Sequence, residues 1–576
     1  MRHPTSIALL MSSSLLLIGL HGCKGTDDTD PAVVDPFAND GGFLSPPQCE
    51  NRCSSDRHSV LDCNGNLLQS CADSEGCDTR TTACTDACAS AAADRGSVGC
   101  EFYAVPPDNA VSSNSIDCFA AFIANTWNSP VTLSGDYNGK PLDISKIAFI
   151  PSGSGQATTY TPIADNQIPA GSIAIVFLSG NYCPAGTASA GLNQGSGTRL
   201  SYGDRLATDR PVAAYDIYPY GGESAAFTSA TLLLPTASWD TNYVAISPFE
   251  VNVSPGVTHF VAAQDGTQIT ILPAKDILGG PGVSAATAGT PTTYNLDRGQ
   301  MILFEQPNEY SLDGSAIQSN KPIGMWSSMT CVDIPSNVGT CDSAHQQIPP
   351  VKVLGSEYAL VRYRNRIPGT AEETPPWRIM GLVDGTVLTW EPAVPDGAPT
   401  TLSKGQLAQF DGAGPYVVKS QDADHPIYVS AHMTGCHLLD TSTPLGCTGD
   451  PEFVNVVPAK EFQSSYIFFT DPTYPETNLV LVRAKGDDGV FHDVMLDCAD
   501  GPLAGWMPVG SSGDYEYTRT DLVTGNFEPQ GKCDNGRHEI KSDAPFGITI
   551  WGWDSAVSYA YPGGMSVKPI NNVLVK

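Results

Sequence analysis

The side chains best suited to catalysis are one serine and two neighbouring histidines. Residues 222–226, Gly-Glu-Ser-Ala-Ala, have the glycine and serine spacing of a nucleophile elbow, which holds a serine on a strained turn between a strand and a helix. Ala226 stands where that pattern ends in glycine, and the residues after it show no helical period. His432 and His437 lie on a predicted strand and its loop without a carboxylate motif. We therefore expect no catalytic site, and the alternative is a hydrolase that uses Ser224 and the His432 region.

Acidic loops and cysteine pairs are the residue types that could bind a metal ion. Residues 487–489 and 497–501 are rich in aspartate and glycine, but neither segment has the ligand spacing of a known calcium loop. Two Cys-x3-Cys pairs, which begin at Cys49 and Cys84, have a spacing that zinc would tolerate, yet only one histidine lies in that region. Because the chain is predicted to be exported, we expect these cysteines to form disulfides. The sequence thus predicts no metal and no cofactor, with calcium as an alternative that no motif supports.

The N-terminus has the pattern of an exported lipoprotein. An apolar run over residues 7–20 is too short to span a bilayer and is typical of a signal peptide. The next residues, in the sequence Leu-His-Gly-Cys that ends at Cys23, resemble a bacterial lipoprotein box, although His21 replaces its usual small or aliphatic residue. The resemblance implies a signal peptide over residues 1–22 and acyl chains on Cys23 that anchor the protein to a membrane. An ordinary secretory signal with an incidental cysteine is the alternative.

The residue after the lipid-carrying cysteine and the overall composition bear on location. Lys24, rather than aspartate, follows Cys23, and this resembles the sorting signal of outer-membrane lipoproteins. We therefore predict a location in the cell envelope, on the outer membrane and facing outward or into the periplasm. Residues 23–48 alternate aspartate with proline and glycine, which predicts an extended tether. The net charge of −31 argues against nucleic acid and against docking on anionic lipid, because both need clustered lysine and arginine.

The cysteine count predicts an oxidising compartment. Of 17 cysteines, setting Cys23 aside leaves an even number that can pair completely. Eight of them crowd residues 49–100 and predict a disulfide-rich module of unknown connectivity: Cys49, Cys53, Cys63, Cys71, Cys77, Cys84, Cys88 and Cys100. The others fall into neighbouring pairs, which we expect to close loops: Cys118 with Cys183, Cys331 with Cys341, Cys436 with Cys447, and Cys498 with Cys533.

A phrase with proline in its third position recurs four times and indicates a repeated β unit. It begins at Asp209, Asn320, Asp424 and Asp543, and an apolar residue follows each proline. Asp and Asn favour a turn, and proline is tolerated as the first residue of a strand, so each phrase predicts the start of a strand. The interval is about 100–120 residues, which is the size of a small domain rather than of a solenoid rung.

Other landmarks keep the same phase and set the domain boundaries. Asp-Gly-Thr begins at Asp265 and again at Asp384, each time between apolar runs, which predicts hairpins. We predict an all-β protein of tandem β-sandwich-like repeats with disulfide-closed loops, and a pseudo-symmetric β-propeller is the alternative. The predicted repeats after the module of residues 49–100 are residues 101–235, 236–350, 351–460 and 461–576.

Several of these segments resemble one family. The residues Gly99 to Val105, the phrase at Asn320 and the segment from Cys341 to Pro350 are similar to the N-terminal domain of IgG Fc-binding protein, and the resemblance covers about residues 100–576. Similar domains occur in bacterial surface and secreted proteins, notably of myxobacteria, often behind a cysteine-rich stretch. The family has no agreed catalytic residues, so the resemblance implies none here.

The resemblance and the β repeats favour a binding or adhesion module. Its ligand is expected to be an extracellular protein or a glycan. Trp551, Trp553, Tyr559 and Tyr561 are weak candidates for a ligand-binding face, because such aromatic residues are enriched in interfaces. Core packing is the competing explanation for these four residues.

Overall fold

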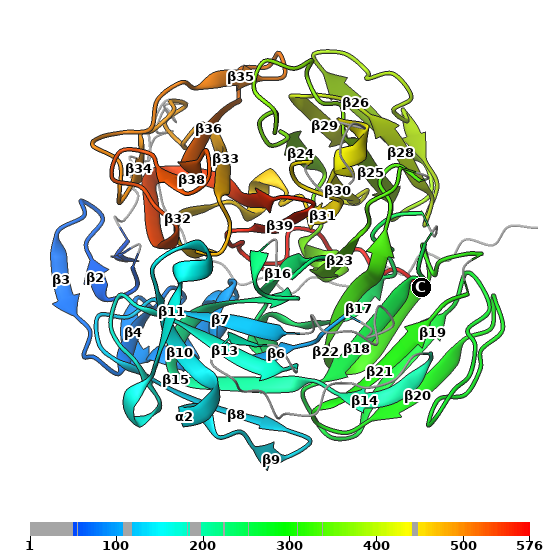
Figure 1. Cartoon of the computed structure of the whole chain (residues 1–576), viewed down its shortest axis with the longest axis horizontal. Helices are drawn as coiled ribbons and strands as arrows, with labels where there is room; N and C mark the ends of the chain where they lie inside the picture. The colour runs from blue at the N-terminus through cyan, green and yellow to red at the C-terminus, as the bar shows by residue number, and fades with distance from the viewer. Residues whose placement is uncertain are drawn as a thin grey trace, which may run out of the picture. The chain divides into compact units, whose positions relative to one another are not determined.

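The computed structural model describes residues 50–54, 56–107, 118–180, 183–184, 197–222, 225–250, 253–307, 309–336, 338–439 and 447–576, and these residues form mostly strands (Figure 1). The predicted signal peptide, the tether, Cys23, Cys49 and Ser224 lie outside the described residues. The all-β prediction is confirmed. Within the described ranges, no helix is both long and apolar enough to cross a membrane.

Grouped by the sheets they form, the strands make up a small N-terminal module and four repeats. Strand β14 (Arg199–Tyr202) falls within the predicted first repeat, residues 101–235, but joins the sheet of repeat 2. The module comprises β1 (Arg52–Cys53), β2 (Ser59–Leu61), β3 (Leu67–Ser70), β4 (Glu75–Asp78), β5 (Ala83–Asp86) and α1 (Ala87–Asp94). Repeat 1 comprises β6 (Val98–Ala104), β7 (Phe119–Asn125), β8 (Val131–Tyr137), β9 (Lys140–Pro141), α2 (Ile144–Ile147), β10 (Ala148–Ser152), β11 (Thr159–Pro162), β12 (Gln167–Ile168), β13 (Ile173–Ser179), β15 (Asp204–Tyr218) and β16 (Ser229–Leu233). Repeat 2 comprises β14 (Arg199–Tyr202), β17 (Asp240–Val244), β18 (Val257–Ala262), β19 (Thr267–Leu272), β20 (Thr292–Leu296), β21 (Gln300–Glu305), β22 (Ala316–Val332) and β23 (Asp342–Gln347).

The last two repeats continue the same series. Repeat 3 comprises β24 (Glu357–Leu360), β25 (Pro376–Gly381), β26 (Thr386–Glu391), β27 (Thr401–Leu402), β28 (Leu407–Asp411), β29 (Tyr416–Ser420), β30 (Ile427–Met433) and β31 (Glu452–Asn455). Repeat 4 comprises β32 (Gln463–Thr470), β33 (Glu476–Ala484), β34 (Val494–Leu496), β35 (Met507–Val509), β36 (Tyr515–Thr524), β37 (Glu528–Pro529), β38 (Gly536–Asp554) and β39 (Val557–Pro562).

All four repeats share one antiparallel pairing scheme. In repeat 2, the first half of the long strand β22 pairs with β17 and β19, and its second half pairs with β18 and β23. The long strands β15 and β38 divide their partners in the same way. In repeat 3 the strand is interrupted, and β29 and β30 belong to two separate four-stranded sheets. Buried residues of both sheets form one core there, so the repeat is a sandwich of two layers.

The proline phrase marks the place where the long strand changes partners. In β22, Ser319 is the last residue that pairs with β19 and Ile323 is the first that pairs with the end of β18, so Pro322 lies in the gap between the two ladders. The same gap surrounds Pro211 in β15 and Pro545 in β38. The prediction that each phrase starts a strand is therefore wrong for three repeats and right only for β30, which begins directly after Pro426. Proline has no N–H to donate, so it costs no ladder bond at this position.

A tyrosine on β17, β24 and β32 fastens each of these strands to the bend of its repeat. The Tyr358 hydroxyl donates to the carbonyl of Ile427 at 2.7 Å and accepts from the Gly355 N–H at 2.9 Å. Tyr243 and Tyr466 make the equivalent bonds in repeats 2 and 4. In repeat 1 the register places Phe102, which has no hydroxyl, at this position.

The other sequence landmarks also have structural counterparts. Gly266 and Gly385 take positive φ in the predicted hairpins, which explains the glycine in each Asp-Gly pair. The aspartates before them accept hydrogen bonds from the N–H groups of Arg298 and Lys404, respectively. The four neighbouring cysteine pairs expected from the sequence are disulfides, and two of them close the loops from β22 to β23 and from β30 to β31.

The last strands of the four repeats meet at the centre of this assembly (Figure 1). Strands β16, β23 and β39 each pair with a long strand and β31 pairs with β30, and the contacts among these four strands run in a closed cycle from β16 to β23, β31, β39 and back to β16. A closed cycle of repeated units is the arrangement expected of a β-propeller, the alternative predicted from the sequence. Repeat 3 is nevertheless a sandwich rather than a single propeller blade, because its strands form two sheets around one core.

Side chains, rather than a backbone ladder, connect these four strands. Ser229 and Thr231 of β16 accept hydrogen bonds from the backbone N–H groups of His345 and Gln347 in β23. The Gln346 amide donates to the carbonyls of Ala230 and Ala560. The buried edges of the central strands thus obtain the hydrogen bonds that a neighbouring strand would otherwise supply.

We predict that Tyr358→Phe lowers the free energy of unfolding by about 1–3 kcal/mol, because it leaves a buried N–H and a buried carbonyl without this partner. The measurement is denaturant unfolding with disulfides intact. Tyr416→Phe in the same repeat is the matched control, because the Tyr416 hydroxyl makes no hydrogen bond to the described residues. Equal stability of the two variants would contradict a structural role for the Tyr358 hydroxyl.

Candidate ligand-binding site

The histidine that sequence analysis named as a catalytic candidate is a structural residue. His432 is 1% exposed, and its two ring nitrogens lie 3.2 Å from the Pro376 carbonyl and 2.8 Å from the Pro248 carbonyl. Burial lowers its pKa to about 3. A neutral imidazole held between two carbonyls inside the protein is not reachable by a substrate, so the described part of the chain offers no observation in favour of the hydrolase alternative.

The four aromatic residues proposed as a binding face lie in the core, and that prediction is wrong. Trp551, Trp553, Tyr559 and Tyr561 are each at most 1% exposed. They are carried by β38 and β39, the strands that reach the centre, where neighbouring repeats cover both faces. Their apolar area therefore stabilises the fold and is not available to a ligand.

The acidic loops are satisfied by local partners. Asp488 lies 3.0 Å from His492, and Asp500 pairs with Lys532. Asp497, Cys498 and His538 are the one group in the described residues that has the spacing of metal ligands. The Cys498 sulfur is bonded to Cys533, however, and the His538 ring lies 3.0 Å from Asp497, so these atoms already have partners.

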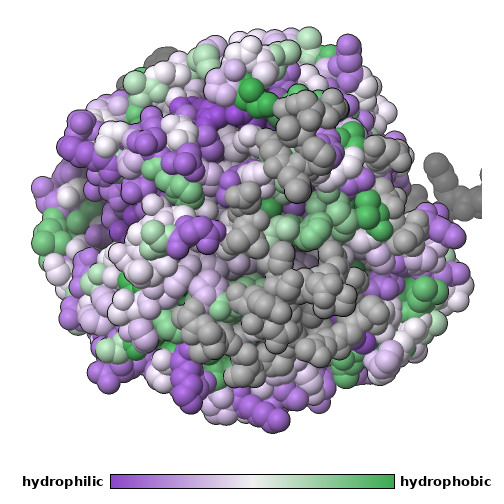
Figure 2. Space-filling view, in the orientation of Figure 1, coloured by the Kyte–Doolittle hydropathy of each residue, from purple (hydrophilic) through white to green (hydrophobic). Residues whose placement is uncertain are grey.

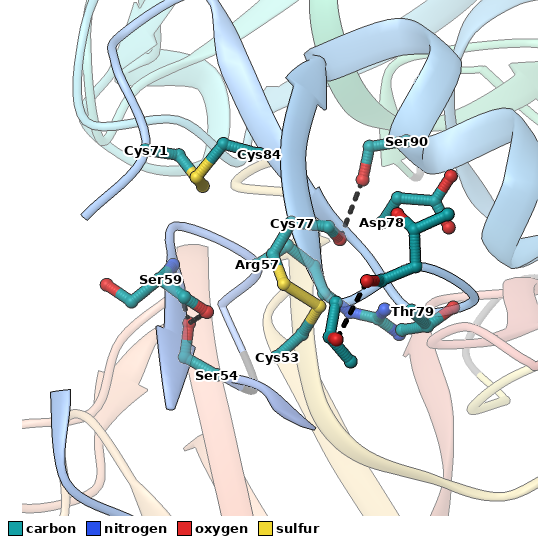
Figure 3. The surroundings of a disulfide bond; sticks show 12 residues. Cys53, Ser54, Arg57, Ser59, Cys71, Cys77, Asp78, Thr79, Cys84 and Ser90 are labelled. Carbon is teal, nitrogen blue, oxygen red and sulfur yellow. Dashed lines mark hydrogen bonds between the residues drawn. A yellow bond between two sulfur atoms is a disulfide. The ribbon is translucent and has the colours of Figure 1, made fainter. Parts of the chain in front are cut away.

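The N-terminal module is held by disulfides (Figure 3). Cys53 pairs with Cys77, Cys71 with Cys84, and Cys88 with Cys100, and Cys63 is also disulfide-bonded. A zinc site is thereby excluded for Cys53, Cys84 and Cys88, because zinc requires free thiolates. Ser90 of α1 donates to the Cys77 carbonyl at 2.8 Å, which fixes the helix against β4. The helix can therefore serve as one rigid wall of a site.

A cavity of about 370 Å³ lies where the module, repeat 1 and repeat 4 meet. One wall is the face of α1 that carries Ala87, Ser90, Ala91 and Asp94. The opposite wall is the beginning of β32, from Gln463 to Ile467. This volume is within the range of small-ligand sites, whereas a cavity within repeat 2 and a cavity between repeats 3 and 4 measure about 10 and 40 Å³.

The charges in this cavity are unevenly satisfied. Asp94 accepts a hydrogen bond from Arg57 at 2.5 Å and lies 3.0 Å from Lys568, so one carboxylate forms ion pairs with both cations. Burial alone would raise the pKa of Asp94, but these two cations hold it below its usual value. Among the described residues, the Glu539 carboxylate has one distant partner, Arg537 at 4.0 Å, and its side chain is 46% exposed. Together with Asp56, which also lines the cavity, Glu539 gives the cavity two carboxylates outside the ion pairs of Asp94.

No pattern in the sequence predicts this site. Its walls come from residues as far apart as Asp56 and Lys568, and no local spacing signals their proximity. The face shown in Figure 2 offers little further guidance, because hydrophilic and hydrophobic residues are interspersed across its coloured part. A hydrophobic patch at its left edge lies where Figure 1 draws β3, whose Leu67 and Leu68 are 61% and 54% exposed.

The centre of the assembly contains acidic groups that belong to the hydrogen-bond network. Glu452 accepts from the Ser229 hydroxyl and from the Ala560 N–H, and Asp342 accepts from the Ser558 N–H. Burial raises the pKa of both groups well above the usual value. Burial also raises the pKa of Asp450 to about 7. These carboxyl groups are engaged in connecting repeats, which argues for a structural role.

We predict that the free energy of unfolding of Asp450→Asn falls less than that of the wild type as the pH rises from 4 to 7. Because burial raises the folded-state pKa above the unfolded value of 3.8, stabilisation by this group is complete below about pH 4 and is lost as the pH rises to about 7. The expected difference is on the order of 2–4 kcal/mol, and asparagine can still accept from Thr340 and Cys436. Denaturant unfolding across this range is the measurement. Asp396→Asn at an exposed turn is the control, and identical profiles for the wild type and Asp450→Asn would refute the prediction.

The comparison with protein families agrees with the resemblance noted in the sequence. The model of the family described as IgGFc binding protein matches residues 229–552, more than half of the chain. The match runs from β16 to β38, whereas the sequence resemblance was expected from about residue 100. No curated protein and no solved structure matches the chain. The chain therefore belongs to the IgGFc-binding protein family.

Proposed function

We propose that this protein is a non-catalytic binding module of the cell envelope that recognises an extracellular protein or glycan. Membership of a binding-protein family is the observation that carries the proposal. The cavity between the module and repeats 1 and 4 supports it, because it combines a rigid disulfide-held wall, polar side chains and a ligand-sized volume. We infer that the site needs no metal or other cofactor.

The binding proposal predicts that filling the cavity weakens ligand binding. The soluble chain that starts at Lys24 would be tested against glycans, cell-wall polymers and immunoglobulins, with and without calcium. Ala91→Trp adds a large side chain to the cavity wall and is expected to weaken binding of the ligand found by about tenfold or more. Ala92→Trp is the matched control, because Ala92 is exposed on α1 outside the cavity.

Two results would count against the binding proposal. A folded, oxidised chain that binds nothing in the array would refute a binding function. Equal binding by the wild type and Ala91→Trp would place the ligand site elsewhere. For the hydrolase alternative, the decisive result would be turnover of an ester or glycan substrate that Ser224→Ala abolishes.

We also propose that Cys23 carries acyl chains and that residues 24–48 hold the folded part away from the membrane. The sequence from Leu20 to Cys23 supports this proposal, since two or more acyl chains give stable anchoring. In a Gram-negative host, the wild type is expected in the membrane fraction and labelled by radioactive palmitate. Cys23→Ser should be unlabelled, and labelling that persists in this variant would exclude Cys23 as the lipidation site.

A further inference from the structure

Strand β32 is an edge strand whose outer side borders the cavity. It pairs only with β38 within its sheet, and residues from Gln463 to Ile467 line the cavity. An edge strand offers backbone N–H and C=O groups to any chain that can lie beside it.

The register of β38 determines their direction. The N–H of Glu539 donates to the Asp497 carboxylate and its carbonyl accepts from the Asp497 N–H, so both groups point away from β32. Ile467, the register partner of Glu539, is therefore in a non-hydrogen-bonded pair and turns its own N–H and C=O outward. Ser465, two residues earlier, has the same orientation.

These outward groups are largely unused. The Ile467 carbonyl accepts from the Tyr215 hydroxyl at 3.2 Å. The Ile467 N–H and both backbone groups of Ser465 have no hydrogen-bond partner in the described part of the chain. The cavity therefore opens onto a short stretch of backbone that can accept an added strand.

The surrounding side chains favour a basic ligand. Arg57 and Lys568 are both held by Asp94, so the cations of the cavity are occupied. Glu539 is half-exposed and only weakly paired, and the chain as a whole carries a net charge of −31. An acidic protein with an unneutralised carboxylate beside an open edge attracts a ligand of the opposite charge.

We propose that an extended polypeptide segment with basic side chains binds in this cavity by adding a strand to the outer edge of β32. Its backbone pairs with Ser465 and with the Ile467 N–H, and a lysine or arginine side chain reaches Glu539. Main-chain bonds supply affinity and the flanking side chains supply selectivity in this mode of recognition. The proposal rests on the proposed binding function, and it assigns the ligand class and the site.

The test uses two labelled peptides, one that alternates threonine with lysine and one that alternates threonine with glutamate. Both favour extended backbone, so they differ mainly in charge. The lysine peptide is expected to bind the soluble chain at least about tenfold more tightly than the glutamate peptide. Amide hydrogen exchange at Ser465 should slow when the lysine peptide is added, because strand pairing protects that N–H.

Two pairs of variants separate the backbone and side-chain contributions. Ser465→Pro removes the outward N–H without removing a bond to β38, and it should abolish peptide binding, whereas Ser465→Ala should bind as the wild type does. Glu539→Lys should weaken binding of the lysine peptide by about tenfold. Glu528→Lys, at an exposed position on β37 outside the cavity, should leave binding unchanged.

Each contrary result overturns a defined part of the proposal. No binding of the lysine peptide, or binding by Ser465→Pro equal to that of Ser465→Ala, would exclude strand addition at β32. An unchanged affinity in Glu539→Lys would exclude the role of that carboxylate. If the array finds a ligand whose affinity none of these variants changes, the binding function stands and this site assignment fails; an empty array refutes the binding function itself.

Discussion

The structure depends on satisfying the inner edges of four central strands. Each of β16, β23, β31 and β39 has a ladder partner on one side only, and its other edge is buried against the next repeat. A buried N–H or carbonyl without a partner costs about 1–3 kcal/mol, so a closed cycle of repeats needs some source of hydrogen bonds there. Serine, threonine, glutamine, asparagine and carboxyl side chains supply them. This requirement explains why polar residues occupy the most buried part of the protein.

The same constraint accounts for the shape of each repeat. A repeat must send its last strand to the centre while its first strands remain at the periphery, so one long strand passes from one set of partners to the other. The change occurs at the proline phrase, where the missing N–H removes the conflict between two ladders. The tyrosine that bonds beside the phrase in repeats 2, 3 and 4 holds this bend in position. Repeat 1 keeps the pairing scheme without the tyrosine, and the family match begins only at its last strand.

The cavity is located where the cycle of repeats closes. Residues 95–97, just before β6, pair with the segment from Met565 to Val567, just after β39, and so join the start of repeat 1 to the end of repeat 4. Repeats 1 and 4 contact each other directly, for example through Tyr215 and Ile467, and the disulfide-rich module lies beside this junction. Helix α1, which carries the disulfide-bonded Cys88, faces the start of β32 across a ligand-sized space. A ligand in this cavity would therefore contact residues of the N-terminal module as well as residues of the segment that matches the family.

Local patterns in the sequence determined the class of fold, the fourfold recurrence and the neighbouring disulfide pairs, because hairpin turns, proline bends and short loop closures depend on residues close together in the chain. They also predicted a binding protein through the family resemblance. Only the tertiary structure decided that Trp551 and Tyr559 are buried, because the sequence of a strand does not reveal which other elements pack against its two faces. It also decided the position of Pro322 inside a strand and the meeting of Asp94 with Ser465 and Glu539 around one cavity. These features arise from contacts across hundreds of residues, where packing rather than local conformation selects the neighbours.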